Sequence, residues 1–379
     1  MSVVEAQAAG LPVVLSDAVT REVACTPLVK TLSLHQSPGR MGRGCLAAAT
    51  ATPKPHGGAD CRWVEYQRSS YGAGSVLQIG VCMLNKLRVP EWCCAVRFNT
   101  DGHTVFDDLE TPFTVLKNSR RYWCADPFLY QRDGQYYLFF EAYDRLKRKG
   151  MLGYRTVSKD GCGKIQVFYE SAGHLSYPFL FEKEGELYII PESSAEKELF
   201  LLRCVSFPDQ WVKERVLLQE SLADTTRLVF SGGTFYLSEQ VDDTRIFDRL
   251  DLFYEDGAGR LCPCAANPVK RDLTTARCAG ACFQQNDQWL RPSQDCGETY
   301  GGKLNFNRID DLTDDGYVET CIRTLSVSDI QTNSSEVFSG IHTYNTCGPV
   351  EVVDLKLPSC FHLLNLIGAV WKRIRRKAE

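Results

Sequence analysis

Three features that would assign a protein to a well-known class are missing from this sequence. None of its 379 residues belong to an apolar run of eighteen, so no helix is expected to cross a membrane. The formal net charge is -4, and the lack of a basic excess excludes a general nucleic-acid binder. The opening residues, MSVVEAQAAGLPVVLSDAV, have neither the basic stretch nor the apolar core of a signal peptide. We therefore expect a cytoplasmic protein.

The sequence has 17 cysteines but lacks the spacing that a metal site requires. Cysteines lie close together in the segments 93–94, 262–264 and 278–282 (CC, CPC and CAGAC). None of these segments has the paired CxxC or Cys/His pattern of a zinc site. Without an export signal the cysteines are expected to be reduced thiols. We expect no metal and no other cofactor.

Helical periodicity is also scarce, between residues 76 and 357. Turn signals follow one another there every eight to twelve residues or so, which is the pattern of an all-β protein.

The sequence contains a repeat. Residues 126–141, DPFLYQRDGQYYLFFE, and 177–192, YPFLFEKEGELYIIPE, share Pro, Phe, Leu, Gly, Tyr and a closing Glu. Each copy predicts two strands and a tight turn, because apolar residues alternate and a glycine stands between the two halves. Further copies of decreasing similarity are found at 224–239, 278–295 and 339–354.

The copies recur about every fifty residues, which is the size of a four-stranded propeller blade. We therefore predict a five-bladed β-propeller over residues 75–357. A ring must close, because an open last blade would leave an unpaired edge. The segment SVLQIGVCML, 75–84, is predicted to complete the final blade from the N-terminal side. A β-sandwich is the alternative, but it gives no reason for the period.

Seven ordered motifs within about 76–357 carry a family resemblance. They are LSYPFLFEKEGELYIIPESS, RCVSFPDQW, LADTT, NPVKRDLTTAR, RPSQDCGETYGG, FNRIDDLT and IHTYN. The segment resembles the N-terminal domain of glucosamine inositolphosphorylceramide transferases and their bacterial homologues associated with surface-polysaccharide genes. The resemblance implies a five-bladed propeller related to arabinanase, levansucrase and invertase glycosidases. The transferase chemistry of the plant protein is usually assigned to a separate domain.

The N-terminal residues show a second resemblance. Residues 1–23 resemble part of the donor-binding half of a two-Rossmann-domain glycosyltransferase, and residues 1–36 are predicted to be a truncated fragment of that kind. In that family a Glu at the place of Glu5 approaches the ribose, and Gly10 lets the chain turn into the strand LPVVLSD. A nucleotide-sugar site needs a complete sheet and a facing domain, so the fragment alone is not expected to bind a donor. Residues 37–74, rich in Pro, Gly and small residues, are predicted to be a disordered linker.

Candidate catalytic residues follow from the geometry of a propeller, in which the innermost strands converge on a central channel. Glycosyl transfer or hydrolysis needs two carboxyl groups in different protonation states. Asp126, within the ADP motif that resembles the general-base motif of the related glycosidases, is predicted to be the base. Glu192, within PES, is predicted to be the acid. A second Asp expected in those glycosidases falls at Tyr177.

Other residues in repeat or family positions are predicted to bind substrate. These are Tyr177, Asp224, Arg277, Asp295 and His342. For the repeated acids Glu141 and Glu239 two interpretations are equally open: they take part in the chemistry, or they cap turns and bond to the neighbouring backbone. His342 is equally well explained as a core histidine with satisfied hydrogen bonds, and Tyr122 and Trp123 as core aromatics rather than platforms for a sugar ring.

Residues 358–379 are predicted to form a basic amphipathic helix. Apolar residues follow helical spacing, and five basic residues cluster between 372 and 377. Two interpretations are open: the helix lies on an anionic membrane surface, making the protein peripheral to the membrane, or it docks on the propeller with solvated charges.

Three functional hypotheses result. The first is glycosyl transfer in glycan or polysaccharide biosynthesis, by this chain or as an accessory to a partner glycosyltransferase. The second is a glycosidase of the arabinanase-like group, favoured if a third carboxylate replaces the one missing at Tyr177. The third is a non-catalytic glycan-binding or scaffold propeller, favoured if the central acids are salt-bridged to Arg277 or Arg227 and closed to solvent.

Overall fold

The computed structural model describes residues 13–16, 29–32, 88–99, 103–241 and 247–361, and four residues beyond them. The chain forms two compact units, Met1–Tyr71 and Gly72–Glu379. In the first unit, β1 (Val13–Ser16) pairs in parallel with β2 (Val29–Leu32). β1 is the strand expected within LPVVLSD. The rest of the predicted glycosyltransferase-like fragment, and the predicted linker 37–74, lie outside the described residues.

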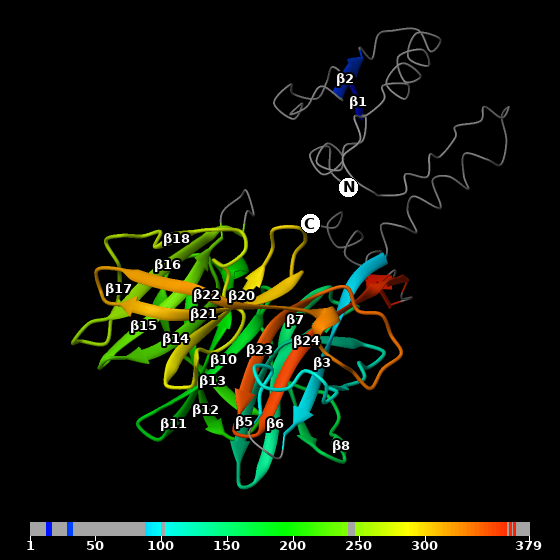
Figure 1. Ribbon diagram of the computed structural model, residues 1–379, viewed down its shortest axis with the longest axis horizontal. Helices are drawn as coiled ribbons and strands as arrows, with labels where there is room; N and C mark the ends of the chain where they lie inside the picture. The colour runs from blue at the N-terminus through cyan, green and yellow to red at the C-terminus, as the bar shows by residue number, and fades with distance from the viewer. Residues whose placement is uncertain are drawn as a thin grey trace, which may run out of the picture. The chain divides into compact units, whose positions relative to one another are not determined.

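The second unit is an all-β propeller of five antiparallel sheets (Figure 1). Blade 1 contains β5 (Tyr122–Arg132), β6 (Gln135–Asp144), β7 (Lys149–Ser158), β8 (Gly161–Cys162) and β9 (Gln166–Tyr169). Blade 2 contains β10 (Ser176–Lys183), β11 (Glu186–Glu192), β12 (Leu199–Ser206) and β13 (Gln210–Leu218). Blade 3 contains β14 (Leu222–Phe230), β15 (Gly233–Gln240), β16 (Arg249–Glu255), β17 (Leu261–Pro263) and β18 (Lys270–Arg271).

The last two blades complete the ring. Blade 4 contains β19 (Phe283–Gln285), β20 (Gln288–Asp295), β21 (Lys303–Leu312) and β22 (Tyr317–Ser326). Blade 5 has the strand order β23 (Ile341–Cys347), β24 (Val350–Phe361), β3 (Arg88–Phe98) and β4 (Thr114–Val115). Two 3-10 turns, Ser194–Glu196 and Val327–Asp329, interrupt the β-structure. Among the described residues, no helix reaches the length and apolarity needed to cross a bilayer.

All five predicted repeat copies are confirmed as the first two strands of successive blades. Their hairpin turns follow from the residues that the copies share. In blades 1 to 3 the turn residues Asp133-Gly134, Glu184-Gly185 and Ser231-Gly232 all have positive φ. Such turns match the right-handed twist of the strands, and glycine adopts this backbone without a steric penalty. Blade 4 uses Asn286-Asp287, also with positive φ, as the sequence indicated.

An N-terminal strand closes the ring, as predicted, but it is not the predicted one. β3 pairs antiparallel with β24, from Val350 beside Phe98 to Phe361 beside Arg88. Figure 1 shows this closure as cyan β3 beside orange-red β24. The strand paired with β24 is 88–98, whereas segment 75–84, expected in this place, lies outside the described residues. The pairing removes the open edge that a linear array of blades would have.

Neighbouring blades are held together by aromatic packing. Phe139 of blade 1 meets Trp211 of blade 2 edge to face, with ring centroids 6.0 Å apart. Phe306 of blade 4 meets Tyr344 of blade 5 at 5.2 Å. These side chains are buried, and pairs of this geometry stabilise the fold by about 0.5–1.5 kcal/mol beyond the area that they bury.

The helix predicted from the sequence over residues 358–379 starts too early in the chain. β24 continues to Phe361, so residues 358–361 are strand rather than helix. Leu364, Asn365, Ile367 and Gly368 are helical, and the basic cluster of residues 372–377 lies outside the described residues. The proposed contact with an anionic membrane surface therefore stays a prediction.

Replacing Val96 by Pro is expected to destabilise the closed ring by about 3 kcal/mol or more. Val96 is buried and lies between Val352 of β24 and Thr114 of β4, where proline removes a ladder donor from a central strand. Chemical denaturation would measure the change. V96A is the matched control, and equal stability of the two variants would show that β3 pairing contributes little to the fold.

Candidate functional site

The innermost strands of blades 1, 2 and 3 are bent at equivalent positions. Asp126, Tyr177 and Asp224 have φ values of +50°, +43° and +48°, each beside a register shift in the strand pair. Positive φ in a non-glycine residue costs about 1–3 kcal/mol and tends to occur at functional sites. Each bulge interrupts the alternation of its strand, and the repeat places these three residues at equivalent points of three blades.

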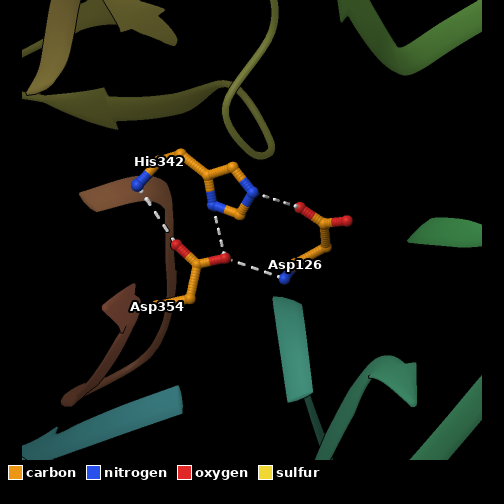
Figure 2. A group of neighbouring side chains, drawn as sticks. All are labelled: Asp126, His342 and Asp354. Carbon is orange, nitrogen blue, oxygen red and sulfur yellow. Dashed lines mark hydrogen bonds and ion pairs between the residues drawn. The ribbon is translucent and has the colours of Figure 1, made fainter. Parts of the chain in front are cut away.

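Asp126 is linked to blade 5 through His342 and Asp354 (Figure 2). The His342 ring lies between the two carboxylates, with Nδ1 2.6 Å from Asp354 Oδ2 and Nε2 3.6 Å from Asp126 Oδ1. Asp354 Oδ2 also accepts a hydrogen bond from the Asp126 backbone N–H at 2.9 Å. Asp126 itself accepts bonds from the Tyr177 N–H and the Thr343 hydroxyl. The contacts fix the orientation of both the imidazole and the Asp126 carboxylate.

The same three residues are spaced closely enough to hold a metal ion. One ligand atom from each of Asp126, His342 and Asp354 lies within 4.8 Å of the others. Asp354, however, already accepts hydrogen bonds from His342 N, Thr343 N and Asp126 N in addition to its ion pair with the imidazole. Its oxygens are thus satisfied by the protein.

Arg277 connects three blades at a second group of acids. Its Nε lies 2.6 Å from Asp224 Oδ2 and its Nη1 2.7 Å from Glu239 Oε2, both in blade 3. Its Nη2 lies 3.8 Å from Glu192 Oε2 of blade 2. Asp224, Glu239 and Arg277 are all buried. Burial of these charges is tolerable only because they are paired, and this part of the centre is a buried ion-pair network.

Glu141 faces the same group of acids without being paired to a cation. Its Oε1 lies 3.4 Å from His174 Nε2, and the backbone N–H of Gly150 donates to His174 Nδ1. Burial lowers the pKa of His174, so the ring is neutral near pH 7 and carries its proton on Nε2. Among the described residues Glu141 Oε1 has no hydrogen-bond partner. His174 Nε2 is thus the nearest described polar atom to this buried oxygen.

Protonation separates the central carboxyls into two groups. Burial raises the pKa of Asp126 to about 6 and of Glu239 to about 7, and it raises the pKa of Glu141 and Asp224 well above the ordinary range. Burial also acts on Glu192, but Arg277 and the hydroxyls of Ser176 and Ser194 outweigh it and lower that pKa. Near pH 7 the cluster accordingly holds an ionised Glu192 and a mostly ionised Asp126 beside Glu141, which retains its proton.

Aromatic rings surround these acids. Trp92 stacks on His342 with centroids 3.8 Å apart and meets Tyr300 edge to face. Trp123 stacks on Tyr143 at 4.5 Å, and its indole N–H has no partner among the described residues. The Arg277 guanidinium lies over the Tyr300 ring at 5.3 Å. Aromatic faces beside hydrogen-bonding groups are suited to binding a sugar ring.

The structure brings together most of the predicted site residues but changes the interpretation of three. Tyr177 is fully buried, and its hydroxyl bonds to Thr226 and the Gly280 backbone, so it ties blades 2, 3 and 4 together instead of offering a surface to substrate. The Asp224 carboxylate already accepts hydrogen bonds from the side chains of Arg277 and Gln294. Asp295 accepts a bond from Gly297 within its own turn and has no described contact with the central acids.

Asp354, Trp92 and His174 were missed by the sequence-based prediction. Asp354 closes the fifth repeat where Glu141, Glu192 and Glu239 close the first three, and this shared place was the available signal. Trp92 and His174 lie outside the repeated segments, so no pattern pointed to them. In place of a turn-capping bond, Glu239 forms an ion pair with Arg277, and Glu141 lies 3.4 Å from His174.

Replacing Gly150 by Ala is expected to lower the free energy of unfolding by about 1–3 kcal/mol through overpacking. A methyl group there would collide with Glu141 Oε1, His174 Cε1 and the Leu175 carbonyl. Chemical denaturation would measure the loss. Gly257, where an added methyl group meets nothing within 4 Å, provides the matched control G257A. Equal stability of the two variants would mean that the Leu175 backbone and the Glu141 and His174 side chains all shift to admit the methyl group.

Comparison with known proteins gives a family match over residues 114–345. The matching family is described as glucosamine inositolphosphorylceramide transferase 1, N-terminal. Glucosamine inositolphosphorylceramide transferase 1 of Arabidopsis thaliana is 34% identical over 205 residues, which cover 52% of this chain and 26% of the relative. The protein of the same name from Oryza sativa subsp. indica is 32% identical over 202 residues, covering 52% and 27%. The matched segment spans about a quarter of these relatives.

Solved structures match this chain at low sequence identity. The catalytic domain of Coprinopsis cinerea GH62 alpha-L-arabinofuranosidase matches with a TM-score of 0.47 and 11% identity, covering 70% of this chain and 97% of that domain. A GH43_1 enzyme from Xanthomonas citri matches with a TM-score of 0.45 and 8% identity, covering 63% and 88%.

Proposed function

Since the chain belongs to the glucosamine inositolphosphorylceramide transferase 1, N-terminal family, we propose that its propeller acts on a sugar in glycan or polysaccharide biosynthesis. The proposed activity is glycosyl transfer, carried out by this chain or together with a partner glycosyltransferase. One observation supports this above all: acids of blades 1, 2 and 3 lie close enough to affect one another's pKa, in different protonation states, beside aromatic rings. A sugar ring and a proton-transfer pair require this combination.

Asp126 is proposed as the general base. A pKa of about 6 leaves it mostly ionised at pH 7 yet close enough to that pH to accept a proton efficiently. The Tyr177 N–H and the Thr343 hydroxyl hold the carboxylate in place, while His342, oriented by Asp354, faces one of its oxygens. His342 and Asp354 act here as positioning residues.

Glu141 replaces Glu192 as the proposed proton donor. A general acid must be protonated before the reaction, and the lowered pKa of Glu192 leaves it ionised. Glu141 is buried, has a strongly raised pKa and has an oxygen with no described hydrogen-bond partner. Glu192, held by Ser176 and Ser194, would instead stabilise the positive charge that develops on a sugar ring during transfer.

Two observations favour the other hypotheses. Glu141 is a third central carboxyl beside Asp126 and Glu192, which is what hydrolysis was expected to require once Tyr177 replaced an acid. The pairing of Asp224 and Glu239 with Arg277 in a buried network is what a purely sugar-binding propeller was expected to show. Asp126 and Glu141, the proposed base and acid, have no arginine ion-pair partner among the described residues, and for this reason we place catalysis ahead of binding alone.

A ligand screen separates the three functions. The full chain would be tested by calorimetry and crystallography with nucleotide sugars, phosphorylated sugars and neutral oligosaccharides, and each bound compound would be assayed for turnover. Binding of a nucleotide sugar with transfer to an acceptor is the expected result. Cleavage of an oligosaccharide would indicate hydrolysis, and binding without turnover a recognition role. A bound sugar that does not contact the central acids would refute the proposed site.

A further inference from the structure

Five arginines are buried in the described residues, and one of them differs from the rest in its partners. Arg97 pairs with Glu351, Arg145 with Glu91, and Arg291 with Glu319. Arg277 pairs with the acids described above. Arg155, which is 8% exposed, has no carboxylate partner among the described residues. A buried charge without a counter-charge is costly, so the counter-charge of Arg155 is expected to come from outside the chain.

The hydrogen bonds of Arg155 hold its guanidinium in position without neutralising it. Nε and Nη2 donate to the Gly163 carbonyl at 3.0 and 2.8 Å, and Nη1 donates to the Lys117 carbonyl at 3.3 Å. A guanidinium has five N–H donors, and these bonds account for three of them. Carbonyl oxygens carry only partial charge. The group is therefore fixed in orientation, keeps its full positive charge and has donors to spare.

Arg155 lines a cavity of about 490 Å³. The cavity lies in blade 1, and none of the acids of the candidate site lines it. The cavity lies between the segment 117–122, which leads into β5, and the β7–β9 region, and it is also lined by Lys117, Lys164, Asn118 and Tyr122. None of its described lining residues is acidic. Both lysines are exposed. Their ammonium groups are therefore hydrated in the free protein and can move toward an anion in the cavity.

We propose that this cavity binds the phosphate group of a small phosphorylated molecule. A phosphate ester carries close to two negative charges at pH 7, and a guanidinium binds its oxygens through paired N–H donors. Three cationic side chains with no acid among them suit a dianion better than the single charge of a carboxylate. The inference is independent of the proposed sugar chemistry, because it shares no residue with the central acids.

Binding of inorganic phosphate and glycerol 3-phosphate to the full chain, at constant ionic strength, tests the inference. We expect R155Q to bind both at least about tenfold more weakly than the unaltered chain, since it removes charge-assisted hydrogen bonds. R132Q, which alters a half-exposed arginine paired with Asp133 on another part of blade 1, should bind as the unaltered chain does. Equal affinity of R155Q and R132Q would overturn the proposal.

Two further measurements keep the test decisive. K117Q and K164Q change exposed residues and should each weaken phosphate binding even if R155Q folds poorly; normal binding in both would count against the site. Flotation with phosphatidylcholine vesicles, with or without phosphatidic acid, distinguishes a lipid headgroup from a free phosphate ester. Binding of acidic vesicles that R155Q abolishes, without binding of soluble phosphate, supports the site and assigns the phosphate to a lipid.

Discussion

Replacing Arg277 by Met should lower the free energy of unfolding by about 3–5 kcal/mol. The substitution leaves Asp224 and Glu239 buried in blade 3 without the cation that they share, and removes the nearest cation from Glu192. Because the cost arises from unpaired carboxylates, it should be largest at pH 8 and shrink toward pH 5, where these acids take up protons. Urea denaturation over this pH range would measure both effects.

An exposed ion pair provides the control for this experiment. Arg260 is 78% exposed at its side chain and pairs with Asp256, so R260M should cost less than about 1 kcal/mol. If R277M were no less stable than R260M, Arg277 would not be required by the acids, and the case for a catalytic rather than a structural cluster would be strengthened. A large loss that does not depend on pH would instead point to lost packing against Tyr300.

Replacing Asp126 by Asn should lower turnover by about 10²–10⁴-fold on the substrate that the ligand screen identifies. Stability should change little, because Asn tolerates the positive φ of this position, and its amide can accept the Tyr177 N–H through its oxygen while its NH2 donates to the Thr343 hydroxyl. Steady-state kinetics would measure the loss. Asp133 has the same φ of +50° but lies exposed in a hairpin turn, so D133N is the matched control. Unchanged turnover in D126N would remove Asp126 from the mechanism.

The pH dependence of stability gives an independent check on Asp126. Its pKa rises from an ordinary 3.8 to about 6 on folding, so between these values the folded chain binds more protons than the unfolded chain. The contribution of Asp126 to stability is thus complete below about pH 4 and is lost as the pH rises through 6. D126N should flatten this part of the stability profile. Parallel profiles for D126N and the unaltered chain would show that the carboxyl titrates normally.

The sequence predicted the five blades because the repeat combines alternating apolar residues with turn residues of fixed backbone preference. It failed for the closing strand for a physical reason. β3, RVPEWCCAVRF, is buried on both faces from Glu91 to Val96, so it lacks the alternation that marks a half-buried strand. It also contains a buried acid and a buried arginine, Glu91 and Arg97, whose partners are more than fifty residues away in the chain.

The candidate site was predictable only in part. Positions such as Asp126 and Glu192 follow from the repeat, because equivalent residues of different blades converge. Protonation states do not, since they depend on burial and on neighbours from other parts of the chain: Arg277, which precedes blade 4, helps to lower the pKa of Glu192 in blade 2. The importance of His174 and Trp92 depends likewise on contacts that no local pattern encodes.

Pairing of Arg88 with Phe361 has a consequence for how this domain could be connected to others. The polypeptide enters and leaves the ring at neighbouring points, so the whole propeller can be inserted into a surface loop of a host protein without separating the two sides of that loop. The same geometry sets its mechanical response. Tension on the two flanking segments would unzip β3 from β24 one hydrogen bond at a time, rather than shear the whole ladder at once.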